Sequence, residues 1–576
     1  MLKLARFLKP YAPLALLSVL FLFVQAFSEL YLPALMADIV DRGIRNGDKA
    51  VILAAGSRML LVAFGGVIAA LIVGFCSSRV AAGFTRDIRR AVFAAVEGFS
   101  NAEFDRFSTA SLITRTTNDV TQLQHLVLMG MRMLFFAPVM GLGSIVMAIR
   151  TGASMSWILV AAVLLVIALI AVVFRIAMPK FRIVQKLIDR LNLVSREHLS
   201  GLMVIRAFRN ESFEQNRFAK ANGDLTAVNL FVNRVMTIMM PTMMLVMNGV
   251  GVLIIWIGSK QIAASSMQVG DMMAYLQYAM HTIMSFLMLS VMFIMIPRSA
   301  VSADRIAEVI GTESSVHDPE SPLPMQAEVA GVVEFRSVSF RYPGADEDVL
   351  SDISFTAKPG TTTALIGPTG CGKSTLAHLI PRFYDASTGS VLVGGVDVRQ
   401  LSQKELRDAI GFVPQKGVLR TGTVADNIRS GKPGAGDAEV AEAARIAQAS
   451  DFIEKLEAGY DAPVSEGGSN FSGGQKQRIS IARAVVKKPA VYIFDDSFSA
   501  LDAATDAKLR AALVPATRSS TVIVVSQRIH TIMHADCILV LDDGRIVGRG
   551  THEELLESCG MYREIALSQL AAEVSK

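Results

Sequence analysis

Six apolar stretches before about residue 300 are each long enough to cross a hydrocarbon layer of about 30 Å as a helix. They predict membrane spans near 13–36, 58–77, 127–149, 155–178, 235–257 and 272–296. Only 19% of the 576 residues are charged, below the usual share of about 25%, and 52% are hydrophobic. Because the apolar excess lies in these stretches, the sequence predicts a membrane domain followed by a globular domain.

Positively charged residues lie beside the predicted spans on one side of the membrane. The positive-inside rule then places both termini and the long connections in the cytoplasm, in a multi-pass protein of the inner (plasma) membrane. This bias toward anionic lipid headgroups accounts for the net charge of +5, and no basic patch interleaved with aromatic residues indicates a nucleic-acid partner. The segment MLKLARFLKPYAPL (1–14) is typical of a basic amphipathic segment in the membrane interface. The residues that carry the rule are Lys3, Arg6, Lys9, Arg79, Arg86, Arg89, Arg90, Arg175, Lys180, Arg182 and Lys186.

Two long connections, residues 79–124 and 180–234, have apolar residues at helical spacing but are too polar to lie in lipid. We expect them to form helical hairpins that extend into the cytoplasm. The last span is followed by TESSVHDPESPLPMQAE, which is rich in Pro, Ser and acidic residues. The predicted organisation is a membrane domain over 1–311, a linker over 312–330, and an α/β domain with a largely parallel sheet over 331–576.

The motif GPTGCGKST (367–375) follows the strand-like TTALI and precedes the helix-like LAHLI. It fits the phosphate-binding loop G-x-x-x-x-G-K-[ST] in its required context, where a chance glycine-rich turn is a poor alternative. Its glycines let backbone N–H groups turn toward a phosphate, Lys373 neutralises the β and γ phosphates, and the Ser374 hydroxyl reaches Mg²⁺. The sequence therefore predicts binding of ATP with Mg²⁺. The predicted contacts in this loop are Gly367, Gly370, Gly372, Lys373, Ser374 and Thr375.

Further along, SNFSGGQKQRISIARA (469–484) precedes the strand-like VYIFDD (491–496). Alone, Ser-Gly-Gly-Gln is a loop that enters a helix and can present donors to an anion. Together with the phosphate-binding loop, these segments make the chain resemble the ATP-binding cassette (ABC) transporters over essentially its whole length. The resemblance implies a half-transporter of the exporter type: an α-helical membrane domain with six transmembrane helices, followed by an α/β P-loop ATPase domain of the ABC type. It also implies that two chains hold two ATP molecules between their cassettes.

The resemblance assigns roles to further residues. Tyr342 stands where an aromatic ring stacks on adenine, although a tyrosine at a strand end before a turn is the alternative. Gln415 matches the glutamine that contacts Mg²⁺ and the attacking water, and Asp495 matches the Mg²⁺-associated carboxylate. Asp502 matches the residue that links the two sites, and Glu466 lies where such exporters contact the partner's hairpins. The signature that touches the γ-phosphate held by the opposite chain is Ser472, Gly473, Gly474 and Gln475.

Two catalytic positions depart from the family pattern. Asp496 stands in place of the glutamate that polarises the attacking water, and Gln527 stands in place of a histidine. The aspartate side chain is one methylene shorter, and a misplacement of about 1 Å can cost roughly 100-fold in rate. Glutamine can hydrogen-bond a phosphate oxygen but cannot carry a proton there. We therefore expect this chain's own site to bind ATP and to hydrolyse it poorly.

An intact signature beside a weakened site favours a heterodimer over a homodimer. In this respect the chain resembles the degenerate-site half of multidrug-type ABC exporters. The expected function is ATP-driven export of hydrophobic or amphipathic compounds, either drug-like molecules or lipids. Two alternatives stay open: an importer built on the exporter fold, and an ATP-gated channel or regulatory subunit that does not pump.

Some residues of the predicted spans have open roles. Met280, Met284, Met288, Met292 and Met295 recur at helical spacing, either as a stripe for varied apolar ligands or as adaptable helix packing. The ionisable residues Glu29, Arg132 and His281 face either a cavity or the interface.

Overall fold

The computed structural model describes residues 2–574. The chain forms two compact units. Unit 1 comprises Met1–Glu97 and Ala110–Thr312, and unit 2 comprises Gly98–Thr109 and Glu313–Lys576. The short segment 98–109, which the sequence analysis includes in the membrane domain, therefore packs with unit 2.

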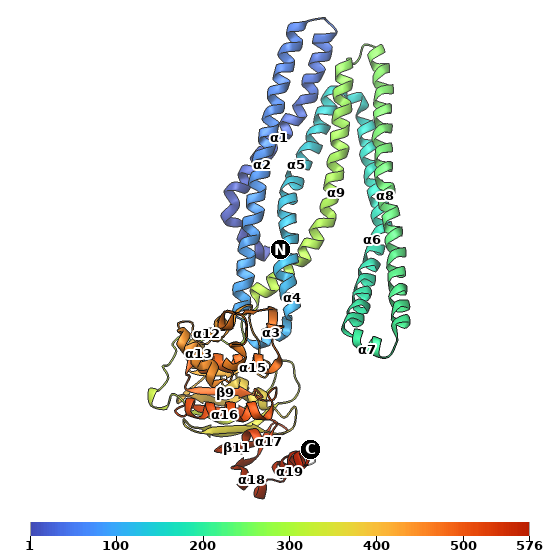
Figure 1. Cartoon of the computed structure of the whole chain (residues 1–576). Helices are drawn as coiled ribbons and strands as arrows, with labels where there is room; N and C mark the ends of the chain where they lie inside the picture. The colour runs from blue at the N-terminus through green and yellow to red at the C-terminus, as the bar shows by residue number, and fades with distance from the viewer. Residues whose placement is uncertain (1, 575–576) are drawn as a thin grey trace. The chain divides into compact units, whose positions relative to one another are not determined.

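Unit 1 contains six long helices, and each includes one predicted span (Figure 1). The predicted helical membrane domain is thus confirmed. Five continuous stretches meet the length and hydropathy needed to cross a membrane, because the chain from Thr109 to Ser200 is helical almost throughout and contains two spans. The long helices are α1 (Ala12–Asp38), α2 (Lys49–Glu97), α5 (Val120–Gly152), α6 (Ser156–Ser200), α8 (Glu211–Ala263) and α9 (Val269–Gly311). The shorter ones are α4 (Thr109–Thr114) and α7 (Leu202–Ala207).

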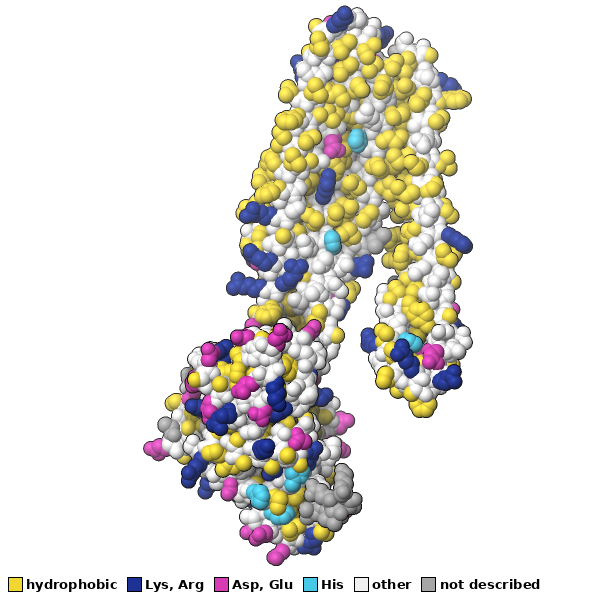
Figure 2. Space-filling model, viewed as in Figure 1, with side chains coloured by type: hydrophobic (Ala, Val, Ile, Leu, Met, Phe, Trp, Pro, Cys, Tyr) yellow, Lys and Arg dark blue, Asp and Glu magenta, His cyan; other side chains and the backbone are white. Residues whose placement is uncertain are grey.

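The helices of unit 1 bury one face and expose another apolar face. Tyr275 and Tyr278 of α9 are fully buried among residues of α1, α5, α6 and α8. In contrast, Leu60 and Leu71 of α2 are 74% and 69% exposed. Figure 2 shows hydrophobic side chains over much of the visible surface of this unit. An apolar outer surface of this extent is what a helix bundle presents to lipid, where the backbone is satisfied within each helix.

Unit 2 is built on a six-stranded sheet with the order β12-β11-β3-β10-β9-β6. All neighbouring pairs are parallel except β11 and β12. Successive residues of the central strands point to opposite faces, and both faces are covered by buried apolar side chains, as in other parallel sheets. The strands are β3 (Thr362–Ile366), β6 (Ile410–Val413), β9 (Val491–Asp495), β10 (Thr521–Val525), β11 (Cys537–Asp542) and β12 (Arg545–Gly550).

A second, antiparallel sheet with the order β2-β1-β4-β5 joins this core, and β7 pairs with β8 separately. Their bounds are β1 (Val333–Phe340), β2 (Leu350–Ala357), β4 (Thr388–Val393), β5 (Val396–Asp397), β7 (Gly422–Thr423) and β8 (Pro463–Val464). The helices are α10 (Lys373–Leu379), α11 (Gln403–Asp408), α12 (Val424–Arg429), α13 (Asp437–Ile446), α14 (Ser450–Ile453), α15 (Gly473–Lys487), α16 (Ala503–Ala516), α17 (Ile529–Ile532), α18 (His552–Ser558) and α19 (Gly560–Val574).

Helix α3 (Asn101–Phe107), between α2 and α4, is fixed within unit 2. Ser100 and Glu103 form a capping box at its start, and Glu103 also accepts a hydrogen bond of 3.1 Å from the Ser315 backbone. Burial disfavours the ionised carboxyl, but the hydrogen bonds from Ser100 and Ser315 hold the pKa of Glu103 below its ordinary value. The Tyr384 hydroxyl donates to Asp105 at 3.1 Å. These contacts hold the tip of the first hairpin, residues 98–109, within unit 2.

Helix α7, at the tip of the second hairpin, has different surroundings. None of its residues is buried, and Met203 and Val204 are 80% and 61% exposed. Phe208, which follows the helix, is 74% exposed. The two hairpin tips therefore differ in how far their own units bury them.

Candidate functional site

A cavity of about 410 Å³ lies where four neighbouring parallel strands end. Lys373 begins the helix that follows β3, and the loops after β6, β9 and β10 carry Gln415, Asp496 and Gln527; all four residues line the cavity. Parallel sheets bind ligands at this edge, because the loops from several strands converge there. The lining residues are Tyr342, Val349, Thr369, Gly370, Gly372, Lys373, Ser374, Thr375, Gln415, Asp496, Val525 and Gln527.

The loop between β3 and α10 has the backbone that the predicted phosphate-binding loop requires. Gly370 and Gly372 have φ of 91° and 95°, a region that favours glycine. Gly367 lies at the base of the loop, where a β-carbon would come within 2.0 Å of the Leu541 carbonyl oxygen. Lys373 is buried, and its Nζ donates to the carbonyl oxygens of Gly367 and Pro368 at 2.9 and 2.6 Å. The lysine thus holds the loop in shape around the cavity.

The candidate Mg²⁺ ligands are close together. The Ser374 hydroxyl donates to Asp495 Oδ1 at 2.8 Å, and Gln415 lines the same cavity. No cluster of three or more His, Cys, Asp or Glu side chains able to hold a metal occurs within residues 2–574. One hydroxyl, one carboxylate and one amide fit Mg²⁺, which usually takes one or two protein carboxylates and completes its shell with phosphates and water. The bound ion would neutralise phosphate charge there.

The two adjacent carboxylates have different surroundings. Asp495 ends β9 and is 3% exposed; burial raises its pKa, and the Ser374 hydrogen bond opposes that rise. Asp496 has φ of 45°, and Gln415 Nε2 donates to its carboxylate at 3.2 Å. Burial also raises the pKa of Asp496, against the Gln415 hydrogen bond. His378 Nε2 lies 3.7 Å from Asp495 Oδ2, and burial lowers the pKa of this histidine.

Tyr342 lies at the edge of the same cavity. Its hydroxyl is 2.9 Å from Thr375 Oγ1, and its ring packs edge-on against Tyr384 with centroids 5.3 Å apart. Tyr384 in turn donates to Asp105 of α3. A continuous set of contacts therefore joins the tip of the first hairpin to the predicted adenine side of the cavity.

The signature residues and Asp502 do not line this cavity, and all of them lie within the described part of the chain. Ser472 caps α15 and forms a capping box with Gln475, while Asp502 caps α16 by accepting from the Thr505 backbone at 3.0 Å. Glu466 is exposed in the turn before the signature. The structure thus separates the predicted ATP contacts into two sets.

Contacts that the sequence does not predict hold the loop around Gln527. Gln569 of α19 donates to the Gln527 carbonyl at 2.7 Å and accepts from the Ile529 backbone at 2.8 Å. Arg528 Nη2 donates to the Ser499 carbonyl at 2.8 Å. The sequence carries no local signal for the Gln569 contact, because forty-two residues separate it from Gln527.

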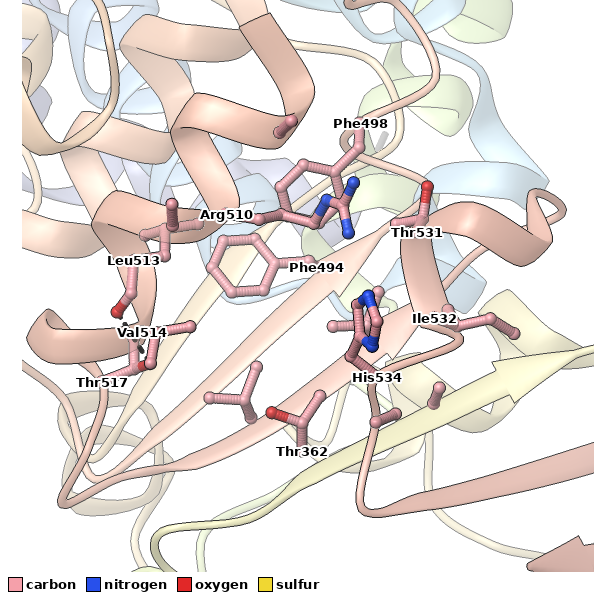
Figure 3. Close-up of a pocket in the computed structure, with 16 residues that line it drawn as sticks. Thr362, Phe494, Phe498, Arg510, Leu513, Val514, Thr517, Thr531, Ile532 and His534 are labelled. Carbon is pink, nitrogen blue, oxygen red and sulfur yellow. Dashed lines mark hydrogen bonds between the residues drawn. The ribbon is translucent and has the colours of Figure 1, made fainter. Parts of the chain in front are cut away.

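A second cavity, of about 430 Å³, lies on the α16 side of the sheet (Figure 3). Phe494, Phe498 and Val514 supply apolar surface, and Arg510 and His534 supply the charged and polar groups. None of the predicted nucleotide contacts, all of them described, lines this cavity. The expectation of ATP binding therefore concerns only the cavity at the strand ends.

Two family profiles match the chain: "ABC transporter transmembrane region" over residues 15–297 and "ABC transporter" over residues 350–499. An uncharacterized ABC transporter ATP-binding protein of Mycobacterium tuberculosis is 44% identical over 567 residues, which cover 98% of this chain and 97% of that protein. The chain belongs to the ABC transporter family.

Other relatives place this transporter among exporters. An ATP-dependent lipid A-core flippase of Pseudomonas aeruginosa is 32% identical, with 98% of this chain and 95% of the flippase covered. The structure of a bacterial Atm1-family ABC exporter with ATP bound matches with a TM-score of 0.75 and 27% identity, over 98% of each chain. The transporter therefore has the ABC exporter fold, with a helical membrane domain followed by an ABC ATPase domain that binds ATP.

Within the membrane unit, most of the methionine stripe packs against other helices. The Met280 methyl lies beside Gly251 of α8, and the Met292 methyl lies beside Gly130 of α5. Met284 is 51% exposed. Glu29 accepts a hydrogen bond of 2.9 Å from Gln25 and interacts electrostatically with His281, whereas Arg132 is exposed. These contacts favour packing over ligand binding for Met280 and Met292.

Proposed function

We propose that this chain is the degenerate-site half of a heterodimeric ABC exporter, one that binds ATP in its own cavity and hydrolyses it poorly. Asp496 and Gln527 carry the proposal, because both line the cavity that also holds Lys373, Ser374 and Gln415. The partner chain would supply the glutamate and histidine that this chain lacks. ATP binding would close the two cassettes, and hydrolysis at the partner's catalytic pair would reset them.

We expect Asp496 to activate the attacking water poorly, because its side chain is short and its carboxylate already accepts a hydrogen bond. Its carboxylate is engaged by Gln415, and the side chain is one methylene shorter than the family's glutamate. A water held at the distance suited to glutamate would be about 1 Å too far, which can cost roughly 100-fold in rate. Gln527 cannot exchange a proton with the phosphate. Both defects concern hydrolysis rather than binding.

Two features of the chain support a second subunit. The signature residues lie outside the chain's own cavity, so they are available to a nucleotide held elsewhere. Helix α7 has no buried residue, and large exposed apolar side chains in a polar hairpin mark a contact surface. Both features suit a homodimer as well as a heterodimer, so the choice between them depends on the Asp496 and Gln527 pair.

The proposed cargo is a hydrophobic or amphipathic compound, in keeping with relatives named lipid A-core flippases. We propose that both termini lie in the cytoplasm, on the side where Arg and Lys follow the spans.

Co-purification from the native membrane, followed by ATPase and transport measurements, tests the proposal. We expect a second half-transporter in the complex, high turnover only in the pair, and less than about twofold loss when Asp496→Ala is made in this chain. A vigorous homodimer whose turnover collapses with Asp496→Ala would overturn it. Uptake in right-side-out vesicles would favour an importer, and a pair that hydrolyses no ATP with cargo present would favour a channel or regulatory subunit.

A further inference from the structure

A basic cavity lies between the N-terminal 3₁₀ segment η1 (Leu2–Tyr11) and helix α2. Its volume is about 360 Å³, and it is lined by Tyr11, Arg79, Ala82, Gly83 and Arg86. All of these residues belong to unit 1. Nothing in the ATP cycle described above uses them.

The cavity is built by specific contacts rather than by loose surface chains. The Tyr11 ring packs against Gly83, where a β-carbon would come within 2.4 Å of the ring. The Tyr11 hydroxyl donates to Asp87 Oδ2 at 2.7 Å. Arg86 donates from Nη2 to the Tyr11 hydroxyl at 3.2 Å and from Nε to Asp87 Oδ1 at 2.9 Å. The Arg86 guanidinium therefore has two hydrogen-bond partners at the cavity wall, and 75% of its side chain stays exposed to a ligand.

The lining suits a phosphate group. Arg79 and Arg86 are about two helical turns apart, so they lie on the same face of α2. Ala82 lies between them and leaves room for a ligand because its side chain is short, while the Tyr11 ring occupies the space beside Gly83. Guanidinium groups bind phosphate oxygens through paired, charge-assisted hydrogen bonds. Asp87 offsets only part of the positive charge, since one carboxylate stands against the two guanidinium groups of Arg79 and Arg86.

The cavity lies where the apolar surface of α2 ends. Leu71 and Phe75, one to two turns before Arg79 and on the same side of the helix, are 69% and 62% exposed. The Arg79 guanidinium lies 5.8 Å from the Phe75 ring centroid. Figure 2 shows Lys and Arg side chains gathered on this unit below the region where hydrophobic side chains dominate. A phosphate bound here would have apolar surface beside it for acyl chains.

We propose that this cavity is a binding site for the headgroup phosphate of an anionic membrane lipid. The phosphate lies between Arg79 and Arg86, and the acyl chains follow the exposed Leu71 and Phe75 surface of α2. The lipid thereby fastens the N-terminal segment to α2 at the membrane interface. Basic pockets on the cytoplasmic side of membrane helices recognise anionic headgroups through the same chemistry.

Native mass spectrometry of the full-length transporter, purified in mild detergent with equal amounts of phosphatidylglycerol and phosphatidylcholine, tests this site. We expect phosphatidylglycerol to be retained in preference, and the Arg79→Gln/Arg86→Gln variant to lose that preference by about fivefold or more. The matched control is Arg89→Gln/Arg90→Gln, which removes the same charge from the same helix outside the cavity. We expect the control to retain the preference.

Equal loss in both double variants would mean that a diffuse basic surface attracts the lipid, and this result would overturn the proposal. No loss in the cavity variant would overturn it as well.

Competition with inorganic phosphate distinguishes a lipid headgroup from free phosphate as the ligand. If it displaces phosphatidylglycerol at the concentrations at which lysophosphatidylglycerol does, the site binds free phosphate and the lipid assignment is wrong. Should the double variant fail to fold, Tyr11→Phe removes the hydroxyl, one of the two hydrogen-bond partners of Arg86. We expect about a twofold loss of preference, and an unchanged preference would contradict the site.

Discussion

Unit 2 holds two sets of predicted ATP contacts with different surroundings. The first set, with Lys373, Ser374 and Gln415, converges on one cavity at the ends of four strands. The second set, the signature from Ser472 to Gln475, starts α15 and lies outside that cavity. The first set is internally bonded, as in the contacts of Lys373 and Ser374, whereas Gly473 has open space where a side chain would lie. This difference supports the proposal that one chain carries a nearly complete ATP site and contributes its signature to a second site.

The strongest test of this comparison changes the signature. In the purified pair, Gly473→Asp should lower ATP turnover at least about 100-fold, because a carboxylate would face the phosphate held by the partner. The fold should tolerate it, since no atom lies within 4 Å of a β-carbon at Gly473. The matched control is Gly434→Asp, another glycine with open space. Retained turnover in Gly473→Asp would mean that the signature does not serve the productive site.

Lys373→Ala tests the first set of contacts, which line the cavity. The variant loses the charge for the phosphates and the two bonds to the loop carbonyls. We expect the ATP affinity of this chain's own site to fall about 10- to 100-fold, measured by nucleotide binding to the isolated chain. Thermal unfolding without nucleotide checks that the loop change does not unfold the domain. An unchanged affinity would show that ATP binds elsewhere.

Repair of the catalytic pair tests why the chain's own site is weak. We expect Asp496→Glu with Gln527→His to raise hydrolysis at this site on the order of tenfold, because the longer acid reaches the water and histidine can exchange a proton. Turnover should be measured with the partner's own catalytic glutamate replaced by glutamine, so that only this site contributes. Gln527→His alone is the control and should gain little. If the double variant shows no gain in ATP hydrolysis, the short Asp496 side chain and the missing histidine do not explain the weak site.

The smallest expected effect concerns Gln569. Its side chain donates a hydrogen bond to the Gln527 carbonyl and accepts one from the Ile529 backbone N–H. In the repaired double variant, Gln569→Ala should reduce the gain by about threefold, because one hydrogen-bonded clamp is lost. A lower kcat with an unchanged KM for ATP would indicate positioning of the Gln527 loop. Ser568→Ala, at the neighbouring exposed hydroxyl, is the control. An equal effect of the two substitutions would mean that α19 acts only through stability.

Local sequence patterns were enough to predict the six long helices, the phosphate-binding loop and the strands at 362–366 and 491–495 that carry part of the site. Each of these depends on local signals: an apolar run of membrane length, a glycine spacing, or a strand followed by a special loop. The second, antiparallel sheet was not predicted, because its strands lack a short motif that indicates their pairing. The placement of residues 98–109 with unit 2 was also missed.

Which residues contact one another across the chain depends on the fold. Long-range contacts such as Tyr384 with Asp105, Gln569 with Gln527, and Tyr11 with Gly83 join segments far apart in the chain. Their side chains carry no local pattern, since a hydrogen bond across a fold depends on packing and not on sequence spacing. The same reason separates the signature from the cavity: the sequence contains both motifs, but only the fold places them at different surfaces.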